Sequence, residues 1–104
     1  MKLYYAEGAC SMASHIAINE AGLKYTPVAM KFDKGDLNTP QFLGLNPLGA
    51  IPVLELDNGK VLTEGVAIMQ YVAAQNPQAN LTPKADTFEH FEFLNWMNFI
   101  LSAL

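Results

Sequence analysis

The sequence is poor in cysteine and in charge, and each shortage excludes a class of protein. One cysteine among 104 residues rules out an internal disulfide framework, so we expect a reducing compartment. Only 15% of the residues are charged, and six basic against ten acidic residues give a net charge of −4. Because the sequence has no basic stripe, neither nucleic acid nor an anionic membrane surface is the expected partner.

Signals for export or membrane insertion are also missing. The amino-terminal residues form no apolar core region with a small-residue cleavage site, so we expect no signal peptide and a cytoplasmic location. The longest uncharged run, residues 93–104, is too short to cross a bilayer. Neither His15 nor His90 has a metal-ligand spacing with a cysteine or a carboxylate, so we expect no metal and no cofactor.

Apolar residues, in contrast, are abundant. They make up 51% of the sequence, more than in a typical soluble domain, so we expect part of the surface to meet a partner. The length corresponds to one domain with a reasonable core.

The first part of the chain has the pattern of a strand, a helix and a second strand. Residues 2–6 are short, aromatic and followed by glycine, which predicts a buried strand. From Met12 onward apolar residues recur at helical spacing, with Ser11 as a candidate cap and Gly22 as the stop. Residues 28–32 place larger apolar side chains at every second position, which predicts a strand. A right-handed crossover would make the two strands parallel.

The middle of the chain predicts a loop, a hairpin and another helix. Residues 34–45 mix Gly, Asp, Asn and Pro, which predicts an irregular loop with one helical turn near its end. Strands at 53–56 and 61–62 flank an Asn-Gly pair, the strongest short hairpin signal. Thr63 is then expected to cap a helix over residues 64–75.

A last helix is predicted to open at Thr82-Pro83 and to run to the end of the sequence. From Phe93 onward it carries no charge, and its polar residues form one narrow stripe of Asn95, Asn98 and Ser102. Such a helix is expected to be buried on most sides, which normally takes several neighbours.

The stretch around which the chain is organised is residues 46–54, a turn-rich segment that leads into a strand. Pro52 lacks a backbone N–H and pushes Ile51 toward extended geometry, so the N–H and C=O of Ile51 can pair with the backbone of a ligand. A cis bond before Pro52 would turn these groups outward, and the pattern leaves the cis and trans alternatives open.

The motif Asn-Pro-x-Gly-x-Ile-Pro-x-Leu at 46–54, followed by residues 62–71, resembles the thioredoxin-like domain of the glutathione transferases. The run Gly8-Ala9-Cys10-Ser11 resembles the bacterial, beta-like class, in which a cysteine sits at the active centre. The resemblance implies an α/β fold with a mixed four-stranded sheet, in a β-α-β and β-β-α arrangement, over residues 1–77. Residues 78–104 would then be a linker and the first helix of a truncated all-α domain. The alternative is a short protein that covers this helix by self-association.

The resemblance also implies a function. The protein would conjugate glutathione to a hydrophobic electrophile and act as a homodimer. Because there is one cysteine, a dithiol cycle is excluded, and a thiol-disulfide activity through Cys10 would take its second thiol from glutathione. The alternative is a non-catalytic interaction module with this fold, against which the presence of both Cys10 and Glu64 argues.

Cys10 is the first candidate for a catalytic residue. It lies between the first predicted strand and the first predicted helix, where free amides and the positive end of the helix dipole stabilise a thiolate. The alternative is a buried, inert cysteine. Tyr5 and Ser11 are lesser candidates, since the resemblance extends to classes in which a tyrosine or a serine donates to the glutathione sulfur.

The candidates for binding glutathione are Lys34, Ile51, Pro52, Glu64, Gly65 and Asn98. Glu64 and the free amides of a helix start match the ammonium and the carboxylate of the γ-glutamyl group, and Gly65 lets the ligand approach. By resemblance, Ile51 pairs with the cysteinyl unit, Lys34 meets the glycyl carboxylate and Asn98 faces the thiol. A solvated loop lysine is an equal alternative for Lys34.

Overall fold

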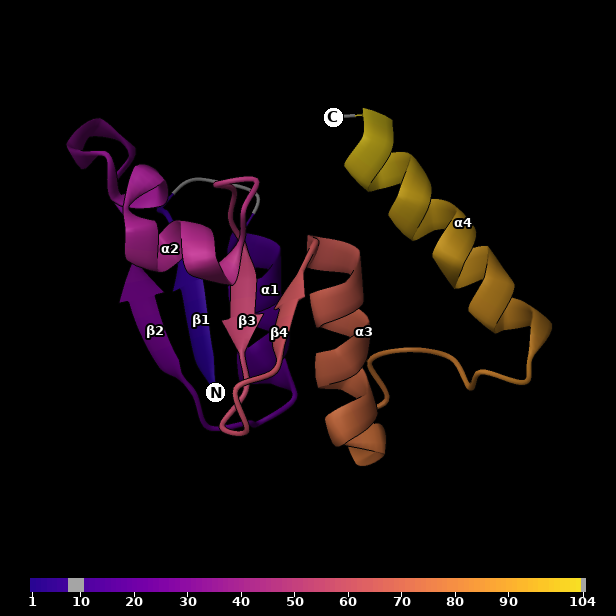
Figure 1. The fold of residues 1–104 in the computed structure, drawn as a ribbon. Helices are drawn as coiled ribbons and strands as arrows, with labels where there is room; N and C mark the ends of the chain where they lie inside the picture. Colours follow the sequence, from indigo (N-terminus) through magenta and orange to yellow (C-terminus); the bar gives the residue numbers. More distant parts are fainter. Residues whose placement is uncertain (8–10, 104) are drawn as a thin grey trace.

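The computed structural model describes residues 1–7 and 11–103 of the chain (Figure 1). Its strands are β1 (Lys2–Tyr5), β2 (Thr26–Ala29), β3 (Val53–Glu55) and β4 (Val61–Thr63). Its helices are α1 (Met12–Glu20), α2 (Pro40–Leu45), α3 (Gly65–Gln75) and α4 (Phe88–Ala103), with short 3-10 turns η1 (Phe32–Lys34), η2 (Asp36–Asn38) and η3 (Pro77–Ala79).

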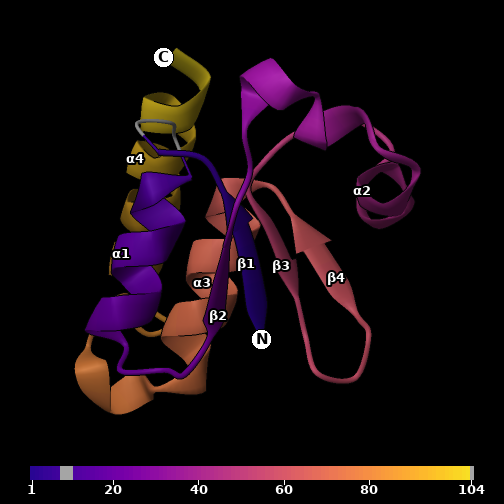
Figure 2. The ribbon, with the colours of Figure 1, turned by 90° about the vertical axis from the view of Figure 1, so that its left-hand side faces the viewer.

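The four strands form one mixed sheet in the order β2-β1-β3-β4. β1 runs parallel to β2 and antiparallel to β3, with Leu3 opposite Leu54. β3 and β4 form an antiparallel hairpin that ends with Val53 opposite Thr63. Helices α1 and α3 cover one face of the sheet, and α2 lies on the other (Figure 2). The predicted thioredoxin-like arrangement is therefore confirmed.

The core lies between the sheet and the pair α1 and α3. Leu3 and Leu54 from the sheet, Ile18 from α1, and Ile68 and Val72 from α3 are all fully buried. Complete burial of a side chain of this size is worth about 1.5–3 kcal/mol, so this cluster fixes the two helices on the sheet.

The opposite face of the sheet carries a polar contact beneath α2. The Tyr4 ring packs edge-on against Phe42 of α2, with ring centroids 5.9 Å apart. The Tyr4 hydroxyl donates a hydrogen bond of 2.8 Å to the carboxylate of Glu55. Burial, together with this hydrogen bond and the charge of Glu55, raises the pKa of Tyr4 to about 12.

The second strand differs from its prediction. β2 ends at Ala29, and Phe32, which was expected in the strand, lies in the turn η1 with 59% of its surface exposed. The chain turns here because the backbone N–H of Lys31 donates to the carboxylate of Asp36 at 2.8 Å. Gly35 completes the turn at a φ of +69°, which favours glycine. The alternation of apolar residues predicted a strand that continues to residue 32, which is too far.

The predicted helical turn before the hairpin is confirmed as α2, which begins after Thr39. The predicted starts of α3 and α4 lie too early in the sequence. Thr63 belongs to β4, and α3 begins at Gly65 after Glu64, whose φ is 63°. The last helix begins at Phe88 rather than at Thr82-Pro83.

The start of α4 is fixed by Thr87. Its hydroxyl oxygen accepts from the backbone N–H of His90 at 3.3 Å, and its O–H donates to the carbonyl of Lys84 at 2.6 Å. These are the bonds of a helix cap, which satisfies an N–H that the helix leaves unpaired.

One side of α4 faces the rest of the domain and the other side is open. The inner side carries the half-buried residues His90, Phe93, Leu94 and Met97. The exposed large apolar side chains of α4 are Phe88, Phe91, Trp96, Phe99 and Ile100. The described chain therefore does not bury this helix on most sides. Within residues 1–7 and 11–103, none of the helices has the length and hydropathy to span a bilayer.

Candidate functional site

The candidate site is a cavity of about 380 Å³ where the segment before β3 meets the start of α3. Both segments lie at the same end of the sheet (Figure 1). Residues lining the cavity include Ser14, Asn46, Ile51, Pro52, Glu64 and Gly65. Four predicted glutathione-binding residues therefore line one cavity: Ile51, Pro52, Glu64 and Gly65.

The turn before β3 is held by the side chain of Asn46, which is only 4% exposed. Its amide N–H donates to the carbonyl of Ala50 at 2.9 Å, and its carbonyl oxygen accepts from the N–H of Leu48 at 3.1 Å. Gly49 in this turn has a φ of +60°, and a Cβ there would lie 3.1 Å from the carbonyl oxygen of Leu37. Asn46 was not predicted as a site residue, although an Asn that opens a Pro-Leu-Gly turn is a local signal for this bonding pattern.

The end of this turn is the Ile51-Pro52 peptide bond, which is cis. The sequence left this alternative open. Pairing of β3 with β1 starts at Val53, so Ile51 lies beyond the end of the sheet ladder and at the cavity wall.

The opposite wall is the start of α3. Amides in the first turn of a helix have no partner within the helix, and the helix dipole favours negative charge there. The exposed Glu64 directly precedes the helix and its side chain makes no capping bond. Gly65 leaves room beside Pro52, because a Cβ there would lie 3.9 Å from the Pro52 ring. The cavity thus offers sites for a cation and for an anion close together.

Ser14 of α1 forms part of the same wall and was not predicted. Its side chain is fully buried, and within the described part of the chain its Oγ has no hydrogen-bond partner. The sequence does hold a signal for it, since Ser14 stands four positions before the buried Ile18 on the same helix face.

Two other predicted binding residues do not line this cavity. Lys34 ends the turn η1 and its side chain is exposed. Asn98 lies on α4, where its amide donates to the carbonyl of Leu94 at 2.8 Å. Their roles stay predictions.

The three catalytic candidates have different surroundings. Cys10 lies outside the described residues. Tyr5 is half-buried, and its ring centroid is 5.2 Å from that of His15. Ser11 is fully buried, and its hydroxyl both accepts from the N–H of Ala6 at 3.1 Å and donates to the carbonyl of Ala6 at 3.2 Å. Ser11 stands at the N-cap position of α1, but the prediction that it caps the helix is wrong for its side chain, because the hydroxyl makes no capping bond and pairs with Ala6, the residue after β1.

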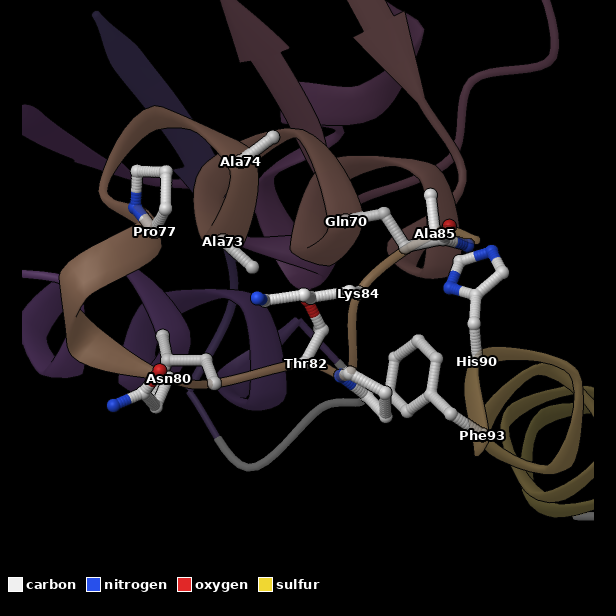
Figure 3. Close-up of a pocket in the computed structure, with 12 residues that line it drawn as sticks. Gln70, Ala73, Ala74, Pro77, Asn80, Thr82, Lys84, Ala85, His90 and Phe93 are labelled. Atoms are coloured by element: carbon white, nitrogen blue, oxygen red, sulfur yellow. The ribbon is translucent and has the colours of Figure 1, made fainter. Parts of the chain in front are cut away.

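A second cavity, of about 420 Å³, lies between the second half of α3, the linker and the start of α4 (Figure 3). Figure 3 shows the rings of His90 and Phe93 on the α4 side and Ala73 and Pro77 on the other. The Nδ1 atom of His90 is buried and has no hydrogen-bond partner among the described residues. This cavity contains none of the predicted site residues. Within the described ranges, His, Asp and Glu side chains form no cluster of three that could hold a metal ion.

Comparison with known proteins decides what kind of domain carries the first cavity. The sequence profile of the family described as "Glutathione S-transferase, N-terminal domain" matches residues 1–74. The chain belongs to the glutathione S-transferase family. The predicted family is confirmed, and the matched glutathione S-transferase domain contains both walls of the cavity.

Relatives from bacteria resemble this chain over nearly all of its residues. "Glutathione S-transferase GstA" from Escherichia coli O157:H7 is 42% identical, and the alignment covers 100% of this chain and 52% of the relative. A solved structure of a glutathione transferase homologue from Sulfitobacter with bound glutathione has a TM-score of 0.91 at 38% identity, covering 97% of this chain and 48% of that one.

A solved structure from the bacterial beta class also resembles the chain. A bacterial beta class glutathione S-transferase from Sphingomonas chungbukensis has a TM-score of 0.86 at 39% identity, covering 95% of this chain and 50% of that one. The predicted resemblance to this class is therefore confirmed. The chain spans about half the length of the curated relatives it matches.

Proposed function

We propose that this glutathione S-transferase domain binds glutathione in the cavity between Ile51-Pro52 and the start of α3. The observation that carries the proposal is that an unpaired strand end, a carboxylate and a free helix start meet in one cavity. The Sulfitobacter homologue, which is 38% identical over 97% of this chain, holds bound glutathione and so supports the proposal.

Each part of glutathione finds a matching group. The backbone N–H and C=O of Ile51 pair with the cysteinyl unit, which extends the sheet edge by one residue. The Glu64 carboxylate pairs with the ammonium of the γ-glutamyl group, while the amides at the start of α3 bind its carboxylate. We propose Lys34 for the glycyl carboxylate and Asn98 for the region of the thiol.

We propose Cys10 as the group beside the glutathione sulfur, with Tyr5 and Ser11 as lesser candidates. In conjugation, the glutathione thiolate attacks an electrophilic carbon and forms a thioether bond. The bond from this carbon to a leaving group then breaks or, in an addition, a double bond or ring opens and takes up a proton. In the disulfide activity, the Cys10 thiolate attacks the glutathione sulfur of a mixed disulfide between glutathione and a substrate thiol, which gives a disulfide between Cys10 and glutathione and releases the substrate thiolate. A second glutathione thiolate then attacks the glutathione sulfur of this disulfide, which frees the Cys10 thiolate and forms glutathione disulfide.

We propose two parts in the chain and an assembled form for the protein. Residues 1–77 are the glutathione-binding domain, and residues 78–104 are the linker and the first helix of an all-α domain. The open apolar side of α4 supports this division. The protein acts as a cytoplasmic homodimer on a hydrophobic electrophile, and it uses glutathione as co-substrate without a further cofactor.

Titration with glutathione and with glutathione disulfide, followed by intact mass, tests the proposal. We expect binding and one glutathione adduct, and we expect the adduct to disappear in Cys10→Ser while glutathione still binds. Glu64→Gln is the matched variant for the binding site, because it keeps the shape of the side chain and removes the charge that pairs with the ammonium. We therefore expect Glu64→Gln to weaken glutathione binding. A folded protein that shows neither binding nor an adduct would instead support the interaction module.

A further inference from the structure

Ser14 has an unusual environment at the wall of the glutathione cavity. Its side chain is fully buried, and among the described residues its Oγ has no donor or acceptor. A buried hydroxyl without a partner lowers the stability of the folded state. The neighbouring buried serine, Ser11, shows the usual pattern, since its hydroxyl makes two hydrogen bonds with Ala6.

The Ser14 oxygen lies next to the start of α3. A Cβ at Gly65 would stand 4.0 Å from this oxygen and 3.9 Å from the ring of Pro52, both ordinary van der Waals contacts. A Cβ at position 65 would therefore be in contact with the Ser14 oxygen. Both residues line the cavity, and Gly65 places no side chain beside the Ser14 oxygen.

The start of α3 lacks donors for a complete carboxylate. A carboxylate has two oxygens with about four lone-pair sites, and the amides at a helix start occupy only part of them. Gly65 and Val66 line the cavity at this point, and neither has a polar side chain. Ser14 lines the same cavity, and its O–H makes no hydrogen bond to any described residue.

We propose that Ser14 is a glutathione-binding residue, whose hydroxyl donates to the γ-glutamyl carboxylate once that carboxylate rests on the start of α3. This assignment relies on the proposed glutathione site. It explains why the hydroxyl has no partner in the ligand-free protein, since its partner is part of the ligand. It also gives Gly65 a second role, which is to place no side chain beside the Ser14 hydroxyl.

The test compares two ligands by titration calorimetry: glutathione, and the analogue with hydrogen in place of the γ-glutamyl carboxylate. We expect Ser14→Ala to weaken glutathione binding about tenfold, because a hydrogen bond to a charged group is lost. Binding of the analogue should be the same in the wild type and in Ser14→Ala. The added methyl group of Gly65→Ala fits the space and should weaken glutathione binding by a similar factor. In a protein that carries Gly65→Ala, the further substitution Ser14→Ala should add no loss of glutathione affinity.

The outcomes separate this assignment from the proposed function. An unchanged affinity of Ser14→Ala for glutathione, with the wild type binding normally, overturns the assignment alone. An equal loss for both ligands also overturns it, because the residue would then act through the packing of α1. A wild type that binds no glutathione overturns the proposed function and the assignment together.

Discussion

Replacing the two fully buried serines at the start of α1 with alanine should lower the stability for Ser11 but not for Ser14. Ser11→Ala removes both hydrogen bonds to Ala6, which is itself only 3% exposed, and leaves its N–H and C=O without these partners. A buried polar group left in this way costs about 1–3 kcal/mol, so we expect a loss of about 2 kcal/mol in the free energy of unfolding.

Ser14→Ala removes a hydroxyl that makes no hydrogen bond in the described structure. The desolvation cost disappears, and alanine favours the helix by up to about 0.7 kcal/mol, while the missing oxygen leaves only a small gap. We expect an unchanged stability or a gain of up to about 1 kcal/mol in the ligand-free protein.

Urea unfolding followed by circular dichroism measures both variants. A slope of roughly 2 kcal/mol per molar urea turns the expected loss for Ser11→Ala into a midpoint about 1 M lower. The midpoint of Ser14→Ala should equal or exceed that of the wild type. If Ser14→Ala loses as much as Ser11→Ala, its hydroxyl has a stabilising partner and the reasoning about Ser14 is refuted.

Three further predictions concern other parts of the domain. Asn46→Ala removes both hydrogen bonds of the turn before β3, so glutathione binding should weaken about tenfold by calorimetry with an unchanged circular dichroism spectrum; full affinity would contradict this role of Asn46. Gly49→Ala should lose at least about 1–2 kcal/mol in urea unfolding, because its φ is +60° and its Cβ would crowd Leu37, whereas the control Gly44→Ala meets open space and should lose nothing. The pKa of Tyr4, raised from 10.0 to about 12, means that the folded state holds this proton more tightly, so its contribution to stability is complete below pH 10 and is lost as the pH rises to 12. An ultraviolet titration should show an ionisation step near pH 12, and this step should be absent in Tyr4→Phe.

The sequence predicted the sheet and the site motif well because both depend on local patterns. The Asn-Gly hairpin and the apolar runs around it placed β3 and β4, and Ile51 and Glu64 line one cavity as the motif suggested. The end of β2 was missed because it depends on the carboxylate of Asp36, a bond that apolar alternation does not encode.

Other features depend on contacts between distant segments. The sequence indicates that Ser14 lies on the buried face of its helix, but its place at the cavity depends on α3, since its oxygen lies beside Gly65. The Ser11 hydroxyl donates to the carbonyl of Ala6 and makes no bond to its own helix, and this likewise depends on where β1 ends. The start of α4 was ambiguous because the sequence offers two threonines, Thr82 and Thr87, that can each precede a helix.

The β3–β4 hairpin determines the distance between the two walls of the cavity. Its last pair, Val53 opposite Thr63, places Pro52 and Glu64 one residue beyond the ladder on neighbouring strands. Side chains alternate along a strand, so a one-residue insertion or deletion inside β4 would rotate Glu64 to the other face of the sheet. Extra residues at the hairpin tip, 57–60, would lengthen the loop without changing this pair. The domain can therefore vary in length at the tip of the hairpin, while the spacing from Val61 to Glu64 cannot change without moving Glu64 and the start of α3 away from Ile51 and Pro52.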